Sequence, residues 1–280
     1  MKCLNVALLG RPSSGKSTFL NTVLGAELSI VASTPQTTRK AIRGIYTEER
    51  GQLVFIDTPG ISDFDKRAKE ISKASLRSIN NAEAVLFIVD AFDDEREEAE
   101  KLIYILSGVK VPILVLINKC DAVKKEKIER RKAYIKENIK DAKIFEISAL
   151  KDEGIDEVLI ELFRIAEERE PVFSPEVWTD ESLEDRVSEL IRGASLSYLQ
   201  KELPHIISVS LEDIELKNGG IWIRAFLNVE RDSQKGIVIG KNGKVISQIK
   251  RDALKSLKNV FPESKGITLD LQVRVRKASF

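Results

Sequence analysis

One stretch of eight residues constrains this chain more than any other. Gly10–Ser17 has the form G-x-x-x-x-G-K-S, with an apolar run, Leu4–Leu9, before it and apolar residues at helical spacing, Thr18–Leu24, after it. A buried strand, a glycine-bearing loop and a helix N-terminus in this order form a cradle in which backbone N–H groups and the helix dipole favour a phosphate. In this pattern Lys16 reaches the β- and γ-phosphates and the Ser17 hydroxyl binds Mg²⁺. We therefore predict a nucleotide-binding domain rather than an ordinary glycine-rich turn.

Strand-like runs alternate with helical stretches over the first part of the chain. Apolar or β-branched runs predict six strands, at Leu4–Leu9, Ala41–Tyr46, Gln52–Ile56, Ala84–Val89, Val111–Ile117 and Lys143–Ile147. Helical spacing of apolar residues predicts helices at Asp94–Leu106 and Ile155–Ala166, and the charged stretch Glu126–Lys140 is interpreted as a solvated helix face. The alternation predicts an α/β domain with a mostly parallel six-stranded sheet. Ligands of such sheets bind at the carboxyl ends of the strands.

The charge of the chain is divided unevenly between its two ends. Residues 231–280 carry twelve lysines and arginines against four aspartates and glutamates, a balance of 12 − 4 = +8, whereas the whole chain carries +1. The remaining residues therefore carry about −7. A basic C-terminal end on an acidic body is typical of a protein that binds nucleic acid through that end.

Cysteine usage and hydropathy indicate where the protein works. Cys3 and Cys120 lie far apart with no metal-like spacing, so we interpret them as reduced thiols. No leader-like segment precedes the phosphate loop, and no apolar stretch approaches the roughly 18–20 residues of a membrane span. With 42% hydrophobic and 32% charged residues, we expect a soluble cytoplasmic protein.

Two motifs fall where a γ-phosphate and its Mg²⁺ would lie. Thr34–Arg39 lies between the first helix and the second strand, and a threonine hydroxyl there would complete the Mg²⁺ shell only when a γ-phosphate is present. Asp57–Gly60, which reads D-T-P-G, follows the next strand. Asp57 would hold Mg²⁺ through water, and the Gly60 N–H would meet the γ-phosphate where a side chain would intrude.

Two further motifs match a guanine base. Asn118–Asp121, which reads N-K-C-D, ends one strand. The Asp121 carboxylate offers two acceptors to the two N–H donors of guanine and would oppose adenine. Ser148 and Ala149 end the last strand, where the Ala149 N–H would donate to guanine O6. D-T-P-G or N-K-x-D alone is a weak match of four residues, but five motifs in order, each at a strand end, predict a domain that binds guanine nucleotides.

The chain changes in character after residue 168. Pro171, Pro175 and a polar run keep the following residues extended, and an amphipathic helix is predicted at Leu183–Leu199. The pattern then predicts strands at Ile206–Leu211 and Ile221–Val229, joined by an Asn-Gly turn. A helix that ends near Leu257 and a last strand at Thr268–Val275 follow. We expect a first domain at 1–168, a linker at 169–181 and a smaller α+β domain at 182–280.

A G-x-x-G loop, Gly240–Gly243, opens the predicted helix of the second domain. KH modules use such a loop to clamp about four nucleotides of single-stranded RNA. Lys241 and Lys244 would neutralise the RNA backbone with a salt-dependent contribution. The basic surround and the order helix–strand–strand–helix–strand favour a KH domain over a chance match. Trp222 and Phe226 are interpreted as strand core rather than as base-stacking residues.

The motifs together resemble those of a known family. Residues 2–167 resemble the Ras-like GTPase domains of the translation-factor class, and a single KH domain after such a domain resembles the Era family of GTPases. Matching stretches include Thr34–Arg39, Asp57–Gly60 and Val229–Lys241. The resemblance implies a Ras-like P-loop GTPase domain with a type II KH domain, binding of GTP and GDP with Mg²⁺, and hydrolysis of GTP to GDP and phosphate. It also implies assistance to small ribosomal subunit assembly.

By this resemblance each motif residue takes a role. Thr38 rather than Thr37 is the Mg²⁺ threonine, and Asn118 and Lys119 support the base and ribose. The catalytic residues are then Lys16, Thr38 and Gly60, and the metal ligands are Ser17, Thr38 and Asp57. The nucleotide-binding residues are Ser13, Ser14, Gly15, Lys16, Ser17, Thr18, Asp57, Gly60, Asn118, Lys119, Asp121, Ser148 and Ala149. The RNA-binding residues are Gly240, Lys241, Asn242, Gly243 and Lys244.

The implied partners are the 3′ end of small-subunit ribosomal RNA and the 30S precursor. They would be bound by a monomer with no obligate protein partner, and contact with the inner membrane surface is left open. A second interpretation keeps the RNA-binding module but makes GTP a gating ligand with negligible hydrolysis. A third, a GTPase that serves RNA modification, would require a cysteine- or cofactor-bearing module, which the sequence does not show.

Two positions depart from the pattern of other GTPases. Family members usually read G-x-P-N-V-G-K-S in the phosphate loop, where this chain has Ser13 and Ser14. The replaced asparagine is associated with a potassium ion that adds positive charge to the transition state, so we expect potassium to accelerate hydrolysis less than about tenfold over sodium. Ile61 stands where many GTPases place a water-orienting glutamine. Because isoleucine makes no hydrogen bond to water, intrinsic turnover should be slow.

Overall fold

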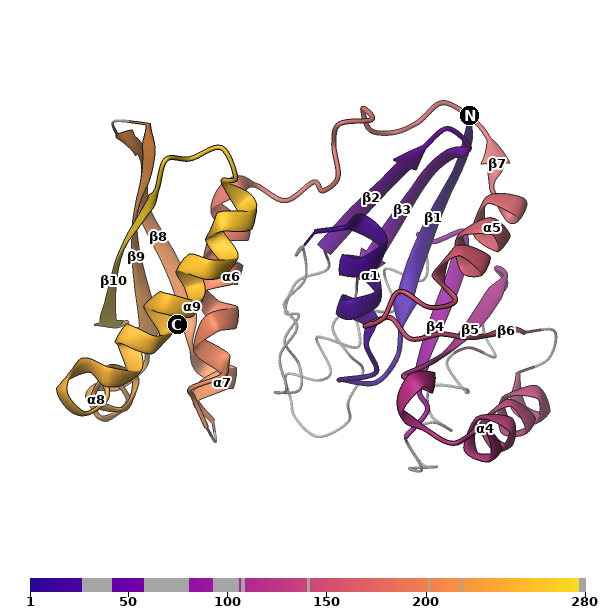
Figure 1. The fold of residues 1–280 in the computed structure, drawn as a ribbon, viewed down its shortest axis with the longest axis horizontal. Helices are drawn as coiled ribbons and strands as arrows, with labels where there is room; N and C mark the ends of the chain where they lie inside the picture. Colours follow the sequence, from indigo (N-terminus) through magenta and orange to yellow (C-terminus); the bar gives the residue numbers. More distant parts are fainter. Residues whose placement is uncertain are drawn as a thin grey trace. The chain divides into compact units, whose positions relative to one another are not determined.

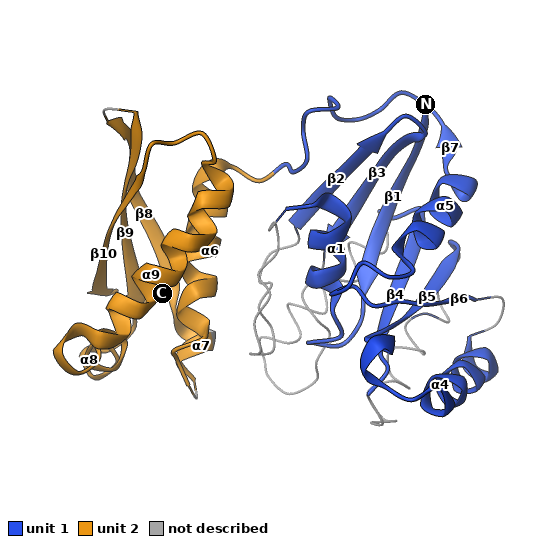
Figure 2. Cartoon of the chain, in the orientation of Figure 1, with its two compact units in different colours: residues 1–29, 35–180 blue, residues 30–34, 181–280 orange. Residues whose placement is uncertain are grey.

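The computed structural model describes residues 1–26, 42–57, 81–92, 106, 109–139, 142–200, 202–217 and 219–276. Within these residues the chain forms two compact units, the first ending at Asp180 and the second beginning at Glu181 (Figure 2). Each unit has its own hydrophobic core. In the part of the chain that the structure describes, no helix is long and apolar enough to span a membrane.

The first unit is built on a sheet with the strand order β2-β3-β1-β4-β5-β6 (Figure 1). Its strands are β1 (Lys2–Leu9), β2 (Ile42–Glu48), β3 (Gly51–Asp57), β4 (Ala84–Asp90), β5 (Ile113–Asn118) and β6 (Lys143–Glu146). All of these pairings are parallel except that of the edge strand β2 with β3. The predicted mostly parallel sheet is confirmed. A further strand, β7 (Glu167–Glu168), pairs antiparallel with the start of β1 and is too short to leave a period in the sequence.

Helices cover both faces of this sheet, so its central strands are buried on both sides. The described helices are α1 (Lys16–Leu24), α4 (Lys125–Asn138) and α5 (Ile155–Ile165). α1 and α5 pack into one apolar cluster, and α4 packs on the opposite face through Ile128 and Ile135. Most charged side chains of α4 lie in solvent, as predicted. The predicted helix at 94–106 lies, except for Leu106, outside the described residues.

The segment expected to be a linker packs on the first unit. Gln52 on β3 is only 1% exposed, and its side chain makes the hydrogen bonds to this segment that the backbone of a neighbouring strand would otherwise make. Its Oε1 accepts from the N–H groups of Val172 (3.1 Å) and Phe173 (3.1 Å), and its Nε2 donates to the Phe173 carbonyl (2.8 Å). One buried amide therefore satisfies three backbone groups of this segment.

Further along, the same segment pairs with the edge strand β2. The Ile45 N–H donates to the Trp178 carbonyl (2.9 Å), and Thr179 forms an antiparallel bridge with Gly44. The Trp178 side chain packs against the core of the unit. Residues 171–180, termed the strap below, therefore extend the edge of the first sheet.

The second unit is a three-stranded sheet with helices on one face (Figure 1). Its elements are α6 (Leu183–Leu196), α7 (Leu203–Ile206), β8 (Ser208–Lys217), β9 (Gly220–Val229), α8 (Asp232–Ile239), α9 (Lys244–Val260) and β10 (Ile267–Val275). β9 lies in the centre, antiparallel to β8 and parallel to β10. The strand predicted from Ile206 begins two residues later, because Ile206 closes the short helix α7, whose start is set by Pro204.

The sequence pattern predicts one helix before the last strand, and the structure has two. α8 precedes the loop Gly240–Gly243 and α9 follows it. Gly236 and the β-branched residues after it have the composition of a strand, which hides α8 in the sequence. The start of α8 is nevertheless well capped, because Gln234 Oε1 accepts from the N–H groups of Glu230 (3.0 Å) and Arg231 (2.9 Å).

Trp222 and Phe226 lie on the face of β9 away from the helices. The core under the helices takes the alternate residues of this strand, so the interpretation as core was wrong for Trp222, which is only half-buried, whereas Phe226 is buried as predicted. Cations cover them instead: Arg224 Cζ lies 4.8 Å from the Trp222 ring centroid, and Arg274 Cζ lies 3.6 Å from that of Phe226. Strand alternation alone does not say which face of a sheet its helices occupy.

Candidate nucleotide-binding and RNA-binding sites

The phosphate loop is a closed turn between β1 and α1. Gly15 caps α1 with φ +100, and a Cβ at this position would lie 2.0 Å from Asn118 Nδ2. Ser13 is also left-handed, with φ 63. Left-handed turns of this kind aim successive N–H groups into an anion-binding concavity. The loop or the first turn of α1 contains Ser13, Ser14, Gly15, Lys16, Ser17 and Thr18.

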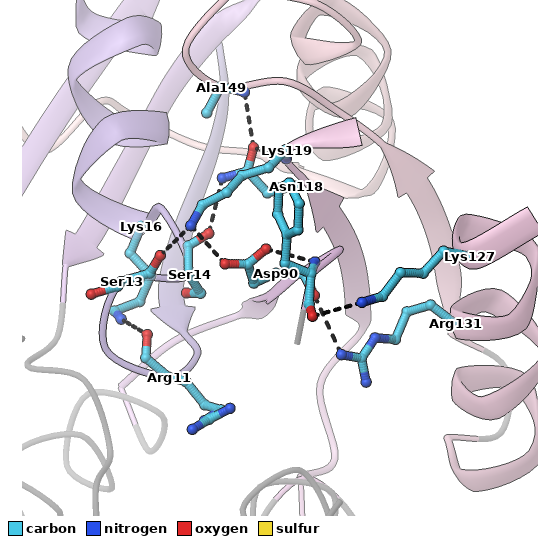
Figure 3. Close-up of polar contacts among 11 residues, drawn as sticks. Arg11, Ser13, Ser14, Lys16, Asp90, Asn118, Lys119, Lys127, Arg131 and Ala149 are labelled. Atoms are coloured by element: carbon cyan, nitrogen blue, oxygen red, sulfur yellow. Dashed lines mark hydrogen bonds and ion pairs between the residues drawn. The ribbon is translucent and has the colours of Figure 1, made fainter. Parts of the chain in front are cut away.

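Asn118 ties three of the predicted motifs together. Its side chain is buried, with 2% of the residue exposed, and its Nδ2 donates to the Ser14 carbonyl (2.9 Å). Its Oδ1 accepts from the N–H groups of Lys119 (2.8 Å) and Ala149 (2.9 Å), as Figure 3 shows. The phosphate loop, the end of β5 and the turn after β6 therefore form one hydrogen-bonded assembly. The Ala149 N–H, predicted to face guanine, is bonded to this amide in the structure.

Lys16 is a buried cation held by the loop that precedes it. The residue is 6% exposed, and its Nζ donates to the carbonyl oxygens of Gly10 (3.1 Å) and Arg11 (2.9 Å). Burial lowers the pKa of Lys16 from 10.5 to about 8, and the charge of Asp57 opposes that shift. The two carbonyl oxygens carry only partial negative charge. A phosphate at this position would place full negative charge beside the ammonium.

Ser17 and Asp57 form a site that suits Mg²⁺. Ser17 Oγ donates to Asp57 Oδ2 over 3.1 Å, and Asp57 is fully buried at the end of β3. A hydroxyl and a carboxylate are the hard oxygen ligands that Mg²⁺ prefers beside phosphate oxygens. The residues present therefore fit the ion. Thr38, Gly60 and Ile61 lie outside the described residues.

Asp121 follows β5 in a short 3₁₀ turn, where its carboxylate faces Ser148 and Lys151. The Ser148 hydroxyl and the Lys151 ammonium, whose Nζ lies 3.4 Å from Asp121 Oδ2, hold the pKa of Asp121 below its usual range. The carboxylate is therefore ionised at neutral pH and offers acceptors only, as recognition of two guanine N–H groups requires. Lys151 was not singled out in the sequence, because a lysine in a polar turn carries no motif.

Both cysteines are free thiols, as predicted. The Cys120 thiol donates to the Ile117 carbonyl, and burial raises the pKa of this thiol to about 11. It stays protonated at neutral pH and acts as packing within the N-K-C-D turn.

The loop Gly240–Gly243 contrasts with the phosphate loop in being open at its second glycine, although a Cβ at Gly240 would lie 2.5 Å from Val245 Cγ2. Asn242 (φ 54) and Gly243 (φ 73) are left-handed, and a Cβ at Gly243 would meet nothing within 4 Å. Lys241, Asn242 and Lys244 are exposed. The predicted G-x-x-G loop is therefore present, with its charged side chains in solvent.

α9 continues the charge of this loop along its solvent face. Ile249, Ala253 and Leu257 are buried against the sheet. The opposite side of the helix carries exposed basic residues one to two turns apart, termed the α9 ridge: Lys244, Arg251, Lys255 and Lys258. Such a ridge attracts a phosphate backbone without reading its sequence.

Comparison with known proteins decides the family. A family model described as 50S ribosome-binding GTPase matches residues 5–119, and one described as KH domain matches residues 202–279. GTPase Era of Treponema denticola is 39% identical over 280 residues, covering 97% of this chain and 94% of that protein. GTPase Era of Borreliella burgdorferi is 39% identical over 282 residues, covering 99% and 95%. The chain belongs to the Era family of GTPases.

Solved Era structures agree with the whole fold. Era in complex with MgGDPNP and nucleotides 1506–1542 of 16S ribosomal RNA matches with a TM-score of 0.92 and 28% identity, covering 99% of this chain and 95% of that chain. A variant of Aquifex aeolicus Era bound to GDP.AlF4- matches equally, with a TM-score of 0.92 and 28% identity. The Ras-like domain followed by a KH domain is confirmed. The protein is a GTPase that uses GTP, GDP and Mg²⁺, and the interpretation with negligible hydrolysis is set aside.

Proposed function

We propose that this Era-family GTPase assists assembly of the small ribosomal subunit by binding the 3′ end of its RNA through the KH domain. The observation that carries the proposal is the presence of two glycine loops before helix N-termini in one chain, one tied to a guanine motif and one opening a basic helix. The relative solved with nucleotides 1506–1542 of 16S ribosomal RNA supports this choice of RNA. The family model whose description names the 50S ribosome covers residues 5–119, so it does not bear on the RNA that the KH domain binds.

In the first unit, Lys16 neutralises the β- and γ-phosphates. Burial lowers the pKa of Lys16, so the surrounding loop stabilises the ammonium less than water does, and phosphate oxygens would restore that stabilisation. Since this charge is present in both the ground state and the transition state, Lys16 serves binding and turnover alike. The N–H groups of Ser13, Ser14, Gly15, Ser17 and Thr18 complete the cradle.

Ser17, Asp57 and Thr38 hold Mg²⁺, with Asp57 acting through water. An ion held by these residues would supply positive charge against the charge that develops on the phosphates during hydrolysis. The Gly60 N–H fixes the γ-phosphate. Because Ile61 makes no hydrogen bond to the attacking water, turnover by the protein alone is slow.

At the base, Asp121 accepts from guanine N1–H and N2–H₂. Asn118 holds the phosphate loop and the base motif in register, and Lys119 supports the base and ribose. The Ala149 N–H, which bonds to Asn118 Oδ1 in this structure, turns to guanine O6 when the nucleotide binds. Ser148 helps to hold the pKa of Asp121 below its usual range.

In the second unit, Gly240 and Gly243 let the RNA backbone approach, and Lys241, Asn242 and Lys244 contact its phosphates. The α9 ridge adds attraction that depends on salt but not on sequence. Because the clamp needs unstacked bases, duplex RNA binds poorly.

The test is to replace Lys241 and Asn242 together by Asp and to measure binding of a single-stranded RNA from the small-subunit 3′ end. Two carboxylates facing phosphate should reduce the affinity by more than about a hundredfold. GTP affinity should be unchanged, since the nucleotide lies in the other unit. The matched control replaces Lys255 and Lys258, further along the same helix, by Ala, and should only weaken binding and flatten its salt slope by about one to two units. RNA affinity indifferent to the double Asp change would exclude the clamp.

We also propose domain boundaries, an oligomeric state and a cellular location for the protein. We place the GTPase domain at 1–168 and the KH domain at 182–280, with 169–181 joining them and residues up to 180 packed on the first unit. We infer a cytoplasmic monomer, with any contact to the inner membrane peripheral. Analytical ultracentrifugation with and without GTP tests the monomer, and a stable dimer in either state would contradict it.

A further inference from the structure

The carboxylate of Asp90 lies between the base motif and the phosphate loop. Asp90 ends β4, at the same edge of the sheet as the predicted site residues. Its Oδ2 accepts from Lys119 Nζ over 2.6 Å, and the same ammonium donates to the Ser13 carbonyl over 2.9 Å (Figure 3). Asp90 leaves no signal in the sequence, because a lone carboxylate at a strand end belongs to no motif.

Several bonds fix the position of this carboxylate. Asp90 Oδ1 accepts from the Phe92 N–H (2.8 Å), which closes the turn after β4. The backbone of the turn is held from α4, since Arg131 Nη2 donates to the Asp90 carbonyl (3.3 Å) and Lys127 Nζ to the Phe92 carbonyl (2.8 Å). Asp90 is therefore a fixed acceptor rather than a mobile surface acid.

Lys119 is anchored at both ends. Its backbone is left-handed, with φ 67, and is held by the bond from its N–H to Asn118 Oδ1. Its ammonium reaches the Ser13 carbonyl in the phosphate loop. The aliphatic stem therefore spans the distance from the base motif to the phosphate loop. A lysine stem has four rotatable bonds and considerable rotamer entropy, so one neutral carbonyl is a weak anchor for its tip.

We propose that Asp90 is a positioning residue for the nucleotide. Its carboxylate fixes the tip of Lys119, so that the stem already lies along the base and ribose before GTP or GDP arrives. The inference rests on the proposed role of Lys119 as the support of base and ribose. It assigns to Asp90 an effect on nucleotide retention that is common to GTP and GDP, since neither the γ-phosphate nor the guanine edge meets this carboxylate.

The primary test is Asp90→Asn in the full chain. Asparagine keeps an acceptor for the Phe92 N–H but removes the charge that holds the ammonium. The affinities for GDP and for a non-hydrolysable GTP analogue should both fall by the same factor, about tenfold, through faster dissociation. In steady-state hydrolysis KM should rise by a similar factor while kcat changes by about twofold or less. Asp90→Ala, which also frees the turn, should be at least as severe.

A double-mutant cycle shows whether Asp90 acts through Lys119. In a Lys119→Ala background, Asp90→Asn should cause no further loss of affinity, because the side chain that it positions is gone. Glu129→Ala is the matched control: it removes a carboxylate 3.0 Å from Lys132 on α4 and should leave nucleotide affinity unchanged. Asp90→Asn should also leave the ratio of GTP to xanthosine triphosphate affinity unaltered.

The outcomes separate this inference from the proposed function. Wild-type affinity in Asp90→Asn, with Lys119→Ala impaired, overturns the inference alone. The same loss from Asp90→Asn in both backgrounds shows a role in the fold of the turn and also overturns it. Wild-type affinity in Lys119→Ala contradicts the proposed role of Lys119, and the inference falls with it.

Discussion

The two glycine loops of this molecule are both proposed to bind phosphate groups, but they differ in how far their residues are buried. Both lie before a helix N-terminus, both use left-handed residues, and both carry a lysine. The phosphate loop is tied to Asn118, buries Lys16 and leaves no space for a side chain at Gly15. The loop Gly240–Gly243 is closed at Gly240, against Val245, but open at Gly243, and Lys241 and Lys244 lie in solvent.

The difference fits the ligand that we propose for each loop. A nucleotide is a small ligand that can be surrounded, so a closed loop with buried charge gains from desolvated electrostatics. An RNA strand enters and leaves along its length, so its clamp must stay accessible. A similar glycine pattern should therefore tolerate mutation differently in the two loops, and three substitutions and one change of pH test this difference.

Gly15→Ala should have the largest effect. A methyl group there would lie 2.0 Å from Asn118 Nδ2, and φ +100 is a conformation that alanine avoids. Displacing Asn118 would also release Ser14 and Ala149. We expect GTP and GDP affinity to fall by more than about a hundredfold in equilibrium binding. RNA binding should persist as the control for folding of the second unit, and near-normal nucleotide affinity would show that the loop is less closed than the structure indicates.

Asp121→Asn should have the second-largest effect. It changes recognition of the guanine base, to which neither glycine loop contributes. Losing a bidentate, charge-assisted pairing should weaken GTP binding by about 2–4 kcal/mol, which is measurable by competition with a fluorescent nucleotide. The amide should accept xanthine in return, so affinity for xanthosine triphosphate should rise. A variant that binds GTP normally and ignores xanthosine triphosphate would place Asn118–Asp121 away from the base.

The buried lysine predicts a pH dependence of intermediate size. Nucleotide-free Lys16 has a pKa of about 8, and bound phosphate raises it, so binding takes up a proton above that pH. GTP affinity should fall by up to about tenfold per pH unit above pH 8, with proton uptake visible in calorimetry in two buffers. Stability should move the other way: because the unfolded lysine titrates near 10.5, the nucleotide-free unit should gain stability between about pH 8 and 10.5. Lys16→Ala should abolish both trends.

Gly243→Ala should have the smallest effect. The added methyl group meets no atom of the chain within 4 Å, so only the left-handed backbone at φ +73 resists it. Thermal unfolding should show a loss of about 1–2 kcal/mol in the second unit, with GTP affinity unaffected. A collapse of that unit would mean that the second loop is as tightly enclosed as the first.

Much of the first unit was predictable because its motifs depend on local spacing. Strand runs, the G-K-S turn and Asp121 are each encoded within a few residues, and parallel topology brings strand ends to one edge. What holds the site together was not predictable. The bonds of Asn118 to Ser14 and of Lys119 to Asp90 join residues far apart in sequence, and neither leaves a periodic signal.

The second unit shows other limits of local patterns. α8 was hidden because Ile237, Val238 and Ile239 favour strands, whereas the Gln234 cap and packing of Val238 into the core make them helical. Trp222 was misplaced because alternation gives two faces without saying which one the helices cover. The roles of Thr38 and Gly60 stay predictions.

The strap has a practical consequence for dissecting the protein. β2 is the outermost strand of its sheet, and an uncovered strand edge is a template for pairing with other chains. The strap covers part of that edge at Ile45 and satisfies the amide of Gln52. A GTPase fragment that ends at residue 168 would therefore expose the unpaired edge of β2 and leave the Gln52 amide without its partners, and it should aggregate. A fragment that continues through Asp180 keeps the strap on β2 and should stay monodisperse.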